Sequence, residues 1–274
     1  MRQASSNVDA KHYDTARLRE EYLVTNLMVA DEINMVYSMF DRIIAGGAVP
    51  VKEELVLEAP EILRAEWFTQ RRELGIINVG GDGIVKVGDE EYMIPHKEAI
   101  YVGRGNRHVS FRSLDPEHPA HFYFNSATAH RETGVKQVSK KDAVVMHCGS
   151  LEESNERTIN RLLVKEVVPC CQLQMGMTEL APGSTWNTMP AHTHDRRMEV
   201  YFYFDLAEGA AVCHFMGEPQ ETRHIWMSNE QAVISPQWSI HSACATRNYT
   251  FIWGMCGEND DYGDMDWCAT ENLR

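Results

Sequence analysis

The sequence predicts an all-β protein made of two similar barrels in tandem, with a few short helices at their edges. Short apolar runs separated by Gly, Pro, Asn and Asp follow one another along most of the chain, which is typical of sandwiches and barrels. The two halves also share an order of motifs. An apolar run at 99–102 leads through a turn to His108, and one at 232–235 leads through Pro236 to His241.

The first half begins with the clearest helix pattern of the chain, over residues 14–28. Asp14 is its expected N-cap, and Leu18 and Tyr22 fall at helical spacing. Strands are expected to dominate after this helix. Their expected ranges are 35–44, two runs within 75–87 around a turn at 80–83, 91–94 and 99–102.

A polar, irregular stretch at residues 140–155 predicts the boundary between the barrels. We expect an N-terminal barrel over residues 1–150 and a C-terminal barrel over residues 151–274. In the second half, strands are expected at 171–180, 199–206, 210–215, 224–227, 232–234 and 249–255. One of these strands carries an apolar face, which gives the protein a reason to associate with further copies; its residues are Val200, Phe202 and Phe204.

The charge and composition of the chain exclude some classes of binding partner. The 274 residues include 26 basic and 40 acidic side chains, and the net charge of −14 argues against nucleic acid or an anionic membrane as a partner. A few arginines can still form a local site for a small anion.

The chain has no uninterrupted apolar run of about 18 residues, no signal-peptide pattern at its start and no C-x-x-C among its seven cysteines. We expect a cytoplasmic protein with reduced thiols.

The clearest chemical motif runs from His192 to Glu199. Residues two apart on a strand face the same side, so His192 and His194 present their imidazoles to one point. Glu199 opens the next strand and can add a carboxylate oxygen, and His241 is the best candidate for a fourth ligand. Three imidazoles and a carboxylate suit Zn²⁺, Fe²⁺, Mn²⁺, Co²⁺ or Ni²⁺. The pattern predicts one divalent metal ion per chain.

The spacing His-x-His-x4-Glu followed by Pro-x4-His resembles the two-part metal motif of the cupin superfamily, which consists of jelly-roll barrels. Two positions depart from that motif. Leu206 stands where the family has a glycine after the glutamate, and Ala245 stands where it has an asparagine after the last histidine. Both family positions serve turns, so the ligand assignment is unaffected.

A more specific resemblance covers nearly the whole chain. The sequence resembles the family of 5-keto-4-deoxyuronate isomerases, also called 4-deoxy-L-threo-5-hexosulose-uronate ketol-isomerases. The matching segments are 41–47 (DRIIAGG), 71–81 (RRELGIINVGG), 157–160 (RTIN), 178–183 (TELAPG), 186–194 (WNTMPAHTH), 196–204 (RRMEVYFYF), 220–224 (QETRH) and 251–255 (FIWGM).

This resemblance implies a bicupin fold and a homohexamer. It implies a zinc ion, with metal ligands at His192, His194, Glu199 and His241. The implied activity is the isomerisation of 5-dehydro-4-deoxy-D-glucuronate, a small anionic sugar acid, to 3-deoxy-D-glycero-2,5-hexodiulosonate. That reaction belongs to the breakdown of pectin and other uronate polysaccharides.

An aldose–ketose isomerisation also needs a base near C1 and C2. Glu179 lies on the strand before the histidine pair and is the favoured base, while Tyr201 and Tyr203 share the strand face of Glu199. The substrate carboxylate calls for a cation. The candidate cations are Arg196, which we place with the catalytic residues, and Arg197, Arg157, Arg161 and Arg223.

The first half keeps only part of the metal motif. Glu73 and His108 have no H-x-H before them, because Glu66 and Phe68 occupy the equivalent positions. We therefore expect no metal in the first barrel.

Two other functions stay open, because the cupin fold hosts several chemistries. One is an Fe(II) dioxygenase, which would need oxygen. The other is a non-enzymatic sugar-acid-binding cupin, which would have little reason to keep four metal ligands. The long resemblance in register favours the isomerase.

Overall fold

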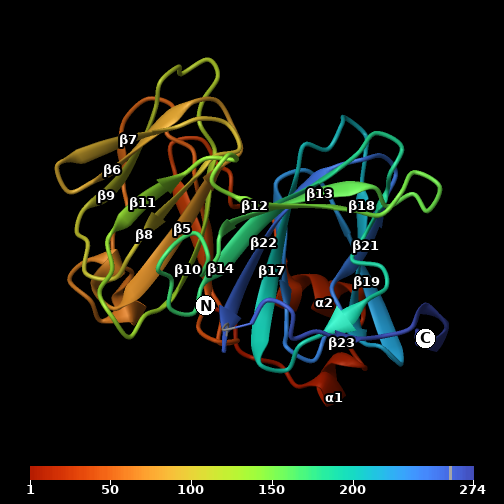
Figure 1. Ribbon diagram of the computed structural model, residues 1–274. Helices are drawn as coiled ribbons and strands as arrows, with labels where there is room; N and C mark the ends of the chain where they lie inside the picture. The colour runs from red at the N-terminus through yellow and green to blue at the C-terminus, as the bar shows by residue number, and fades with distance from the viewer. Residues whose placement is uncertain (259–260) are drawn as a thin grey trace.

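The computed structural model describes residues 1–258 and 261–274, and its two halves lie side by side as β-barrels (Figure 1). Neighbouring strands in each sheet run antiparallel. The expected fold class, tandem jelly-roll barrels with few short helices, is confirmed.

The first barrel packs a six-stranded sheet against a four-stranded sheet. The six-stranded sheet has the order β11 (Val135–Val138), β8 (Ala99–Val102), β5 (Arg72–Asn78), β10 (Phe122–Thr128), β3 (Ile44–Ala48), β2 (Ile33–Tyr37). The four-stranded sheet has the order β4 (Leu55–Val56), β9 (Val109–Ser113), β6 (Gly83–Val87), β7 (Glu90–Ile94). Phe111 and Phe122 meet in the apolar core between these sheets, with ring centroids 5.3 Å apart.

The second barrel pairs a seven-stranded sheet with a four-stranded one. The larger sheet has the order β1 (Leu23–Val24), β20 (Gln231–Ser235), β17 (Arg197–Phe204), β22 (Thr250–Gly257), β14 (Gln174–Leu180), β13 (Arg157–Leu163), β12 (Val144–Cys148). The smaller sheet has the order β15 (Trp186–Asn187), β21 (Ser242–Ala245), β18 (Val212–Glu218), β19 (Glu221–Met227). A separate two-stranded sheet pairs β16 (His192–Thr193) with β23 (Asp266–Trp267).

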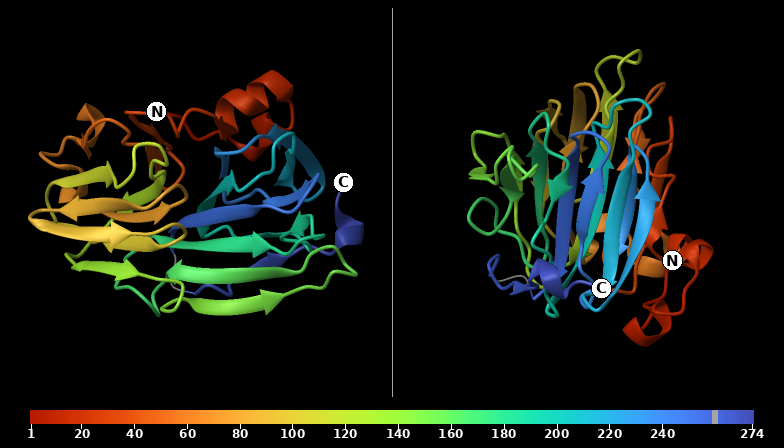
Figure 2. Two further views of the ribbon diagram at one scale, coloured as in Figure 1. Left: turned by 90° about the horizontal axis from the view of Figure 1, so that it is seen from above. Right: turned by 90° about the vertical axis from the view of Figure 1, so that its right-hand side faces the viewer.

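Two short α-helices, α1 (Asn7–Ala10) and α2 (Thr15–Tyr22), pack beside the second barrel (Figure 2). Asp14 caps α2 by accepting the backbone N–H of Arg17 at 2.8 Å. The helix ends at Tyr22 rather than at residue 28, because the next two residues join the sheet edge as β1. The 3₁₀ turns are η1 (Glu61–Leu63), η2 (Phe68–Gln70) and η3 (Thr270–Asn272). Among the described residues, no helix has the length and apolarity that crossing a bilayer requires.

The outer faces of the two large sheets pack against each other and join the barrels. Tyr123 of β10 stacks on Phe202 of β17, with ring centroids 4.3 Å apart. At Gly254 of β22, a Cβ atom would lie 2.1 Å from the side-chain oxygen of Asn125, so only glycine permits this approach. The strand face expected to drive association with other copies is therefore covered by the first barrel, and its residues are at most 1% exposed; they are Val200, Phe202 and Phe204.

One strand prediction in the first half was wrong in detail, while the two runs around residues 80–83 are confirmed as β5 and β6. The range 35–44 contains the end of β2, a turn and the start of β3, because Asp41 and Arg42 adopt positive φ angles of 43° and 55°. The runs on either side of residues 80–83 do not pair with each other. Instead, β5 lies between β8 and β10, while β6 lies between β7 and β9 in the other sheet. The glycine turn carries the chain from one sheet to the other.

The stretch expected to be irregular, residues 140–155, contains strand β12. This strand pairs with β13 from Val144 to Cys148 and so completes the edge of the second barrel's large sheet. The division of the chain at residue 150 stays a prediction.

Candidate metal centre

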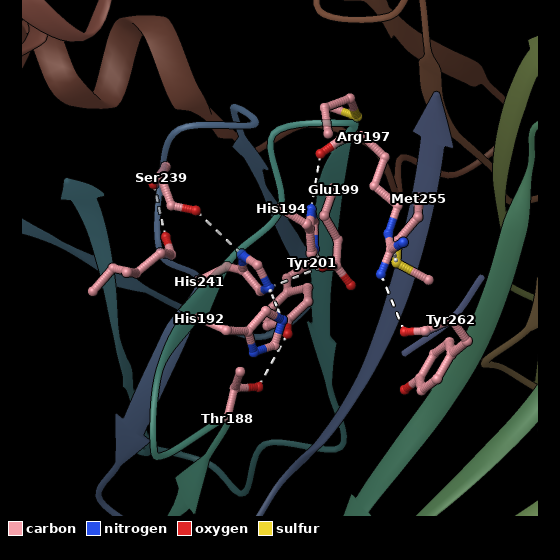
Figure 3. A network of polar contacts seen from close by, with 12 residues as sticks. Thr188, His192, His194, Arg197, Glu199, Tyr201, Ser239, His241, Met255 and Tyr262 are labelled. Atoms are coloured by element: carbon pink, nitrogen blue, oxygen red, sulfur yellow. Dashed lines mark hydrogen bonds and ion pairs between the residues drawn. The ribbon is translucent and has the colours of Figure 1, made fainter. Parts of the chain in front are cut away.

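Three histidines and one glutamate converge in the second barrel (Figure 3). His192 lies in β16, and His194 follows two residues later, as the H-x-H spacing predicts. Glu199 is the third residue of β17. His241 stands directly before β21 and after a turn at residues 236–239.

The four side chains bring their donor atoms within contact distance. The Nε2 atoms of His241 and His192 are 2.9 Å apart. One carboxylate oxygen of Glu199 lies 3.2 Å from Nε2 of His194 and 3.1 Å from Nε2 of His241. All four residues are buried, with exposed fractions between 1% and 6%. The structure therefore brings together the four residues that the sequence predicted as metal ligands.

Backbone carbonyl groups orient two of the imidazoles. Nδ1 of His194 donates to the carbonyl oxygen of Arg197 at 2.9 Å, and Nδ1 of His241 donates to that of Ser239 at 3.3 Å. A ring that carries its proton on Nδ1 keeps the Nε2 lone pair free. These contacts direct the lone pairs of both rings toward Glu199 and His192.

Burial keeps the imidazoles of His192 and His241 neutral at physiological pH. It lowers the pKa of His192 to about 3, with a further contribution from neighbouring His194. Burial also holds the pKa of His241 well below its usual value of 6.5. Neutral imidazoles beside a carboxylate are a donor set that fits a divalent metal ion.

Three of the donor residues, His192, His194 and Glu199, line a cavity of about 390 Å³, which is within the size range of small-molecule sites. Its floor is one face of the large sheet, to which every second residue of each strand contributes. From β17 to β12 the floor residues are Glu199, Tyr201, Phe251, Trp253, Met255, Thr178, Ile159, Arg157, Met146 and Cys148. The walls are formed by Thr188, Met189, Pro190, Tyr262, Gly263, Met265 and Trp267.

Tyr201 is a polar group in this cavity beside the ligands. Its ring lies 5.4 Å from that of His241, and its hydroxyl shares a hydrogen bond of 3.1 Å with that of Thr188. Burial raises the pKa of Tyr201 well above 10, and the charge of Glu199 raises it further. The phenol is therefore a hydrogen-bond donor near neutral pH. Tyr203 bonds instead to buried His214, at 2.7 Å.

The structure does not bring Glu179 to the cavity. Thr178 lines the cavity, and the next residue of a strand faces the opposite side of the sheet. The Glu179 carboxylate accepts hydrogen bonds from Lys97 at 3.0 Å, Lys140 at 2.9 Å and Asn160 at 3.0 Å. The prediction that Glu179 is the base was therefore wrong. Its carboxylate forms ion pairs on the face of β14 that is turned away from the cavity.

Of the five candidate arginines, one lines the cavity with the metal ligands, and it is Arg157. Arg196 does not line this cavity and pairs with Asp264 at 2.7 Å, so its expected catalytic role is not supported by its position. The other three are also engaged elsewhere: Arg197 pairs with Asp264, Arg161 with Glu166, and Arg223 with Glu221.

In the first barrel, Glu73 is fully buried and forms hydrogen bonds that join this barrel to the chain segment leading into the second barrel. Its carboxylate accepts the backbone N–H groups of residues 171–173 at 2.6–2.8 Å and the hydroxyl of Tyr101 at 2.8 Å. His108 is exposed and has a positive φ of 55°. Neither side chain is near a second metal donor set among the described residues.

The sequence reasoning missed the aromatic parts of the cavity. Trp253 could have been found by strand alternation, since it is the partner of Tyr201 on β22. Tyr262 and Trp267 come from the C-terminal segment, which has no periodic pattern. Trp267 reaches the site because β23 pairs with β16, which places its ring 5.0 Å from that of His192.

Comparisons with known proteins agree with this geometry. Residues 22–269 match the KduI/IolB family. Over all 274 residues, the chain is 60% identical to the 4-deoxy-L-threo-5-hexosulose-uronate ketol-isomerase of Bacteroides fragilis NCTC 9343 and covers 98% of that protein. It is 55% identical over its whole length to the enzyme of the same name from Lachnoclostridium phytofermentans and covers 99% of it.

Solved structures show the same fold. An IolB-like protein from Salmonella typhimurium LT2 aligns with a TM-score of 0.73 at 15% identity, over 92% of this chain and 97% of its own. The oxalate decarboxylase of Lactobacillus farciminis aligns with a TM-score of 0.55 at 10% identity, over 85% of this chain and 87% of its own. The match over residues 22–269 and the full-length identities place this chain in the KduI/IolB family, among its 4-deoxy-L-threo-5-hexosulose-uronate ketol-isomerases.

Proposed function

We propose that this protein is a metal-dependent ketol-isomerase that converts 5-dehydro-4-deoxy-D-glucuronate to 3-deoxy-D-glycero-2,5-hexodiulosonate. The observation that carries the proposal is the convergence of four metal donors beside a mainly apolar cavity. The proposed ligands are His192, His194, Glu199 and His241. The names of relatives that share more than half of its residues support the choice of substrate.

The reaction moves a proton from C2 to C1 of an open-chain sugar acid. A bound metal ion supplies Lewis acidity that spreads the negative charge developing on the C1 and C2 oxygens. Tyr201 stays protonated and donates a hydrogen bond to one of these oxygens, with Thr188 holding its hydroxyl in place. Within the described part of the chain, the cavity holds no carboxylate other than Glu199. Glu179 lies outside this cavity and is therefore not the group that transfers the proton.

We further propose the identity of the metal, the oligomeric state and the cellular location of this enzyme. The metal is zinc, since imidazoles and a carboxylate are common zinc ligands. The enzyme is a homohexamer, as the family resemblance implies. It works in the cytoplasm, where its cysteines stay reduced. Elemental analysis of the purified protein, sedimentation analysis and cell fractionation test these statements one by one.

Turnover tests the proposed reaction. The metal-loaded protein should form 3-deoxy-D-glycero-2,5-hexodiulosonate from 5-dehydro-4-deoxy-D-glucuronate at equal rates in air and under argon. Chelation should abolish this turnover, and the addition of Zn²⁺ should restore it. Turnover that requires oxygen would indicate a dioxygenase, and binding without turnover would indicate a non-enzymatic sugar-acid-binding protein.

A further inference from the structure

We infer that Arg157 binds the substrate carboxylate and thereby selects uronates over uncharged sugars. This inference rests on the function proposed above. Among the described residues that line the metal cavity, Arg157 is the one lysine or arginine. A sugar acid in this cavity therefore meets its cation at one defined place.

The guanidinium of Arg157 has no acidic partner in the described part of the chain. Its Nη1 donates to the backbone carbonyl of Asn155 at 2.8 Å, which orients the side chain without neutralising its charge. Arg161, two positions beyond Ile159 on the same face of β13, is different. It pairs with Glu166 at 2.5 Å, and Tyr262 covers it at 4.3 Å. An unneutralised guanidinium beside an apolar floor is a site for an anion.

Arg157 and the metal ligands lie at opposite ends of the cavity floor, as the two functional ends of the substrate require. Glu199 lies on β17 and Arg157 on β13, three strand spacings away on the same face of the sheet. The strand register also places Arg157 just beyond Phe204, at the opposite end of β17 from Glu199. The two offsets together separate the backbones of Arg157 and Glu199 by roughly 24 Å, and both side chains line the cavity between them. The substrate is a six-carbon chain with its reacting C1 and C2 at one end and its C6 carboxylate at the other. It lies along the floor with C1 near the metal ligands and its carboxylate toward Arg157.

Aromatic and small side chains make the floor between these ends. Trp253 and Phe251 of β22 and Thr178 of β14 lie between β17 and β13. At Gly176 of β14, a Cβ atom would lie 2.1 Å from the ring of Trp253, so glycine leaves the space that this ring fills. The floor offers the sugar chain few hydrogen bonds. Orientation of the substrate therefore depends on the two polar ends of the cavity.

The first test measures kinetic constants for Arg157→Gln, Arg157→Lys and the control Arg161→Gln. Loss of the charge-assisted contact should raise KM about 10- to 100-fold for Arg157→Gln, with a smaller change in kcat. Arg157→Lys should recover part of that loss. Arg161→Gln removes the same charge from the same strand and should change KM less than about 3-fold. Metal content and melting temperature of each variant report whether the fold is intact.

A substrate analogue tests selectivity directly. In the analogue, a hydroxymethyl group replaces the carboxylate at C6. The wild-type protein should prefer the uronate over this neutral analogue, and Arg157→Gln should lose most of that preference. Unchanged preference and unchanged KM in Arg157→Gln would overturn the inference. Absence of turnover in the wild-type protein would instead refute the proposed function, so the two failures are distinguishable.

Cys148 provides a readout that does not depend on turnover. It is the cross-strand partner of Arg157 on β12 and lines the same cavity. The cation should favour alkylation of Cys148 by the anion iodoacetate relative to neutral iodoacetamide, as peptide mass spectrometry measures. Arg157→Gln should reduce this ratio at Cys148 and leave it unchanged at Cys268, the control thiol. An unchanged ratio at Cys148 would contradict an anion site at Arg157.

Discussion

The Nε2 atoms of His192 and His241 lie 2.9 Å apart in a buried site, and the two residues are 6% and 1% exposed. Two neutral imidazoles that face each other with both lone pairs repel, whereas a shared cation stabilises them. Glu199 adds a negative charge at 3.1 Å from His241. The metal ion is therefore expected to stabilise the second barrel as well as to support the chemistry.

Removal of the metal should lower the melting temperature. A ligand that binds only the folded state contributes about 2.7 kcal/mol at a free concentration 100-fold above its Kd. The melting temperature of the chelated protein, measured with and without added Zn²⁺, checks this prediction. His194→Ala should bind little metal and should gain no stability from Zn²⁺. Full metal occupancy in His194→Ala would show that the ligand assignment is wrong.

The stability of the metal-free protein should fall as the pH decreases below about 6.5. Burial lowers the pKa of both His192 and His214 to about 3, so the folded state binds fewer protons than the unfolded state between pH 6.5 and 3. Their stabilising contribution is complete above pH 6.5 and is lost as the pH falls through this window. At pH 5 the loss is about 2 kcal/mol for each histidine.

Urea unfolding of the chelated protein between pH 7.5 and 5 measures this dependence. His214→Phe removes one of the two groups and should flatten the pH profile. A profile that stays as steep as that of the wild-type protein would mean that His214 does not contribute to it.

Tyr201→Phe should lower kcat about 10- to 100-fold and change KM little, because the lost hydrogen bond acts on charge that develops during the reaction. Tyr203→Phe is the matched control. It lies two residues along the same strand, but its hydroxyl contacts His214 rather than the cavity. Metal analysis of both variants excludes loss of the ion as the cause. Equal effects of the two substitutions on kcat would refute the role of Tyr201.

Glu73→Gln should destabilise the protein by about 2–4 kcal/mol. The buried carboxylate accepts four hydrogen bonds, three of them from the backbone of residues 171–173. In the variant, the NH₂ group of the glutamine amide would face some of these N–H or O–H donors and could not accept their hydrogen bonds. The free energy of unfolding in urea measures the effect. Glu66→Gln, at an exposed position, should change it by less than about 0.5 kcal/mol. Similar values for the two variants would contradict the bridging role of Glu73.

Glu179→Gln should keep kcat within about 3-fold of the wild-type value, because this side chain lies behind the sheet. It should lower stability slightly, since its partners Lys97 and Lys140 lose an ion pair. If the variant turned over substrate about 100-fold more slowly with the metal still bound, Glu179 would return to the catalytic residues.

The metal ligands were predictable because their evidence is local. Two histidines at i and i+2 face one side of a strand, and a glutamate five residues after His194 reaches the next strand. His241 was found through its spacing after Pro236. These inferences needed strand geometry and the family resemblance, and no knowledge of how distant strands pair.

The other site residues depend on pairings that the sequence does not show. Strand alternation places Glu179 and Thr178 on opposite faces of β14, but only the folded sheet shows that the cavity lies on the Thr178 side. Arg196 and Arg197 are adjacent to the ligands in sequence, but Asp264 binds both from a distant segment. The apolar face of β17 was expected to be exposed and instead packs on Tyr123 of the other barrel. Each of these outcomes results from a long-range contact.

The most direct test is anaerobic turnover of 5-dehydro-4-deoxy-D-glucuronate by the wild-type protein and by His194→Ala, with metal content measured on the same samples. We expect one divalent ion per chain and formation of 3-deoxy-D-glycero-2,5-hexodiulosonate by the wild-type protein, and loss of both in His194→Ala. Formation of this product by a metal-free His194→Ala protein at the wild-type rate would contradict this expectation.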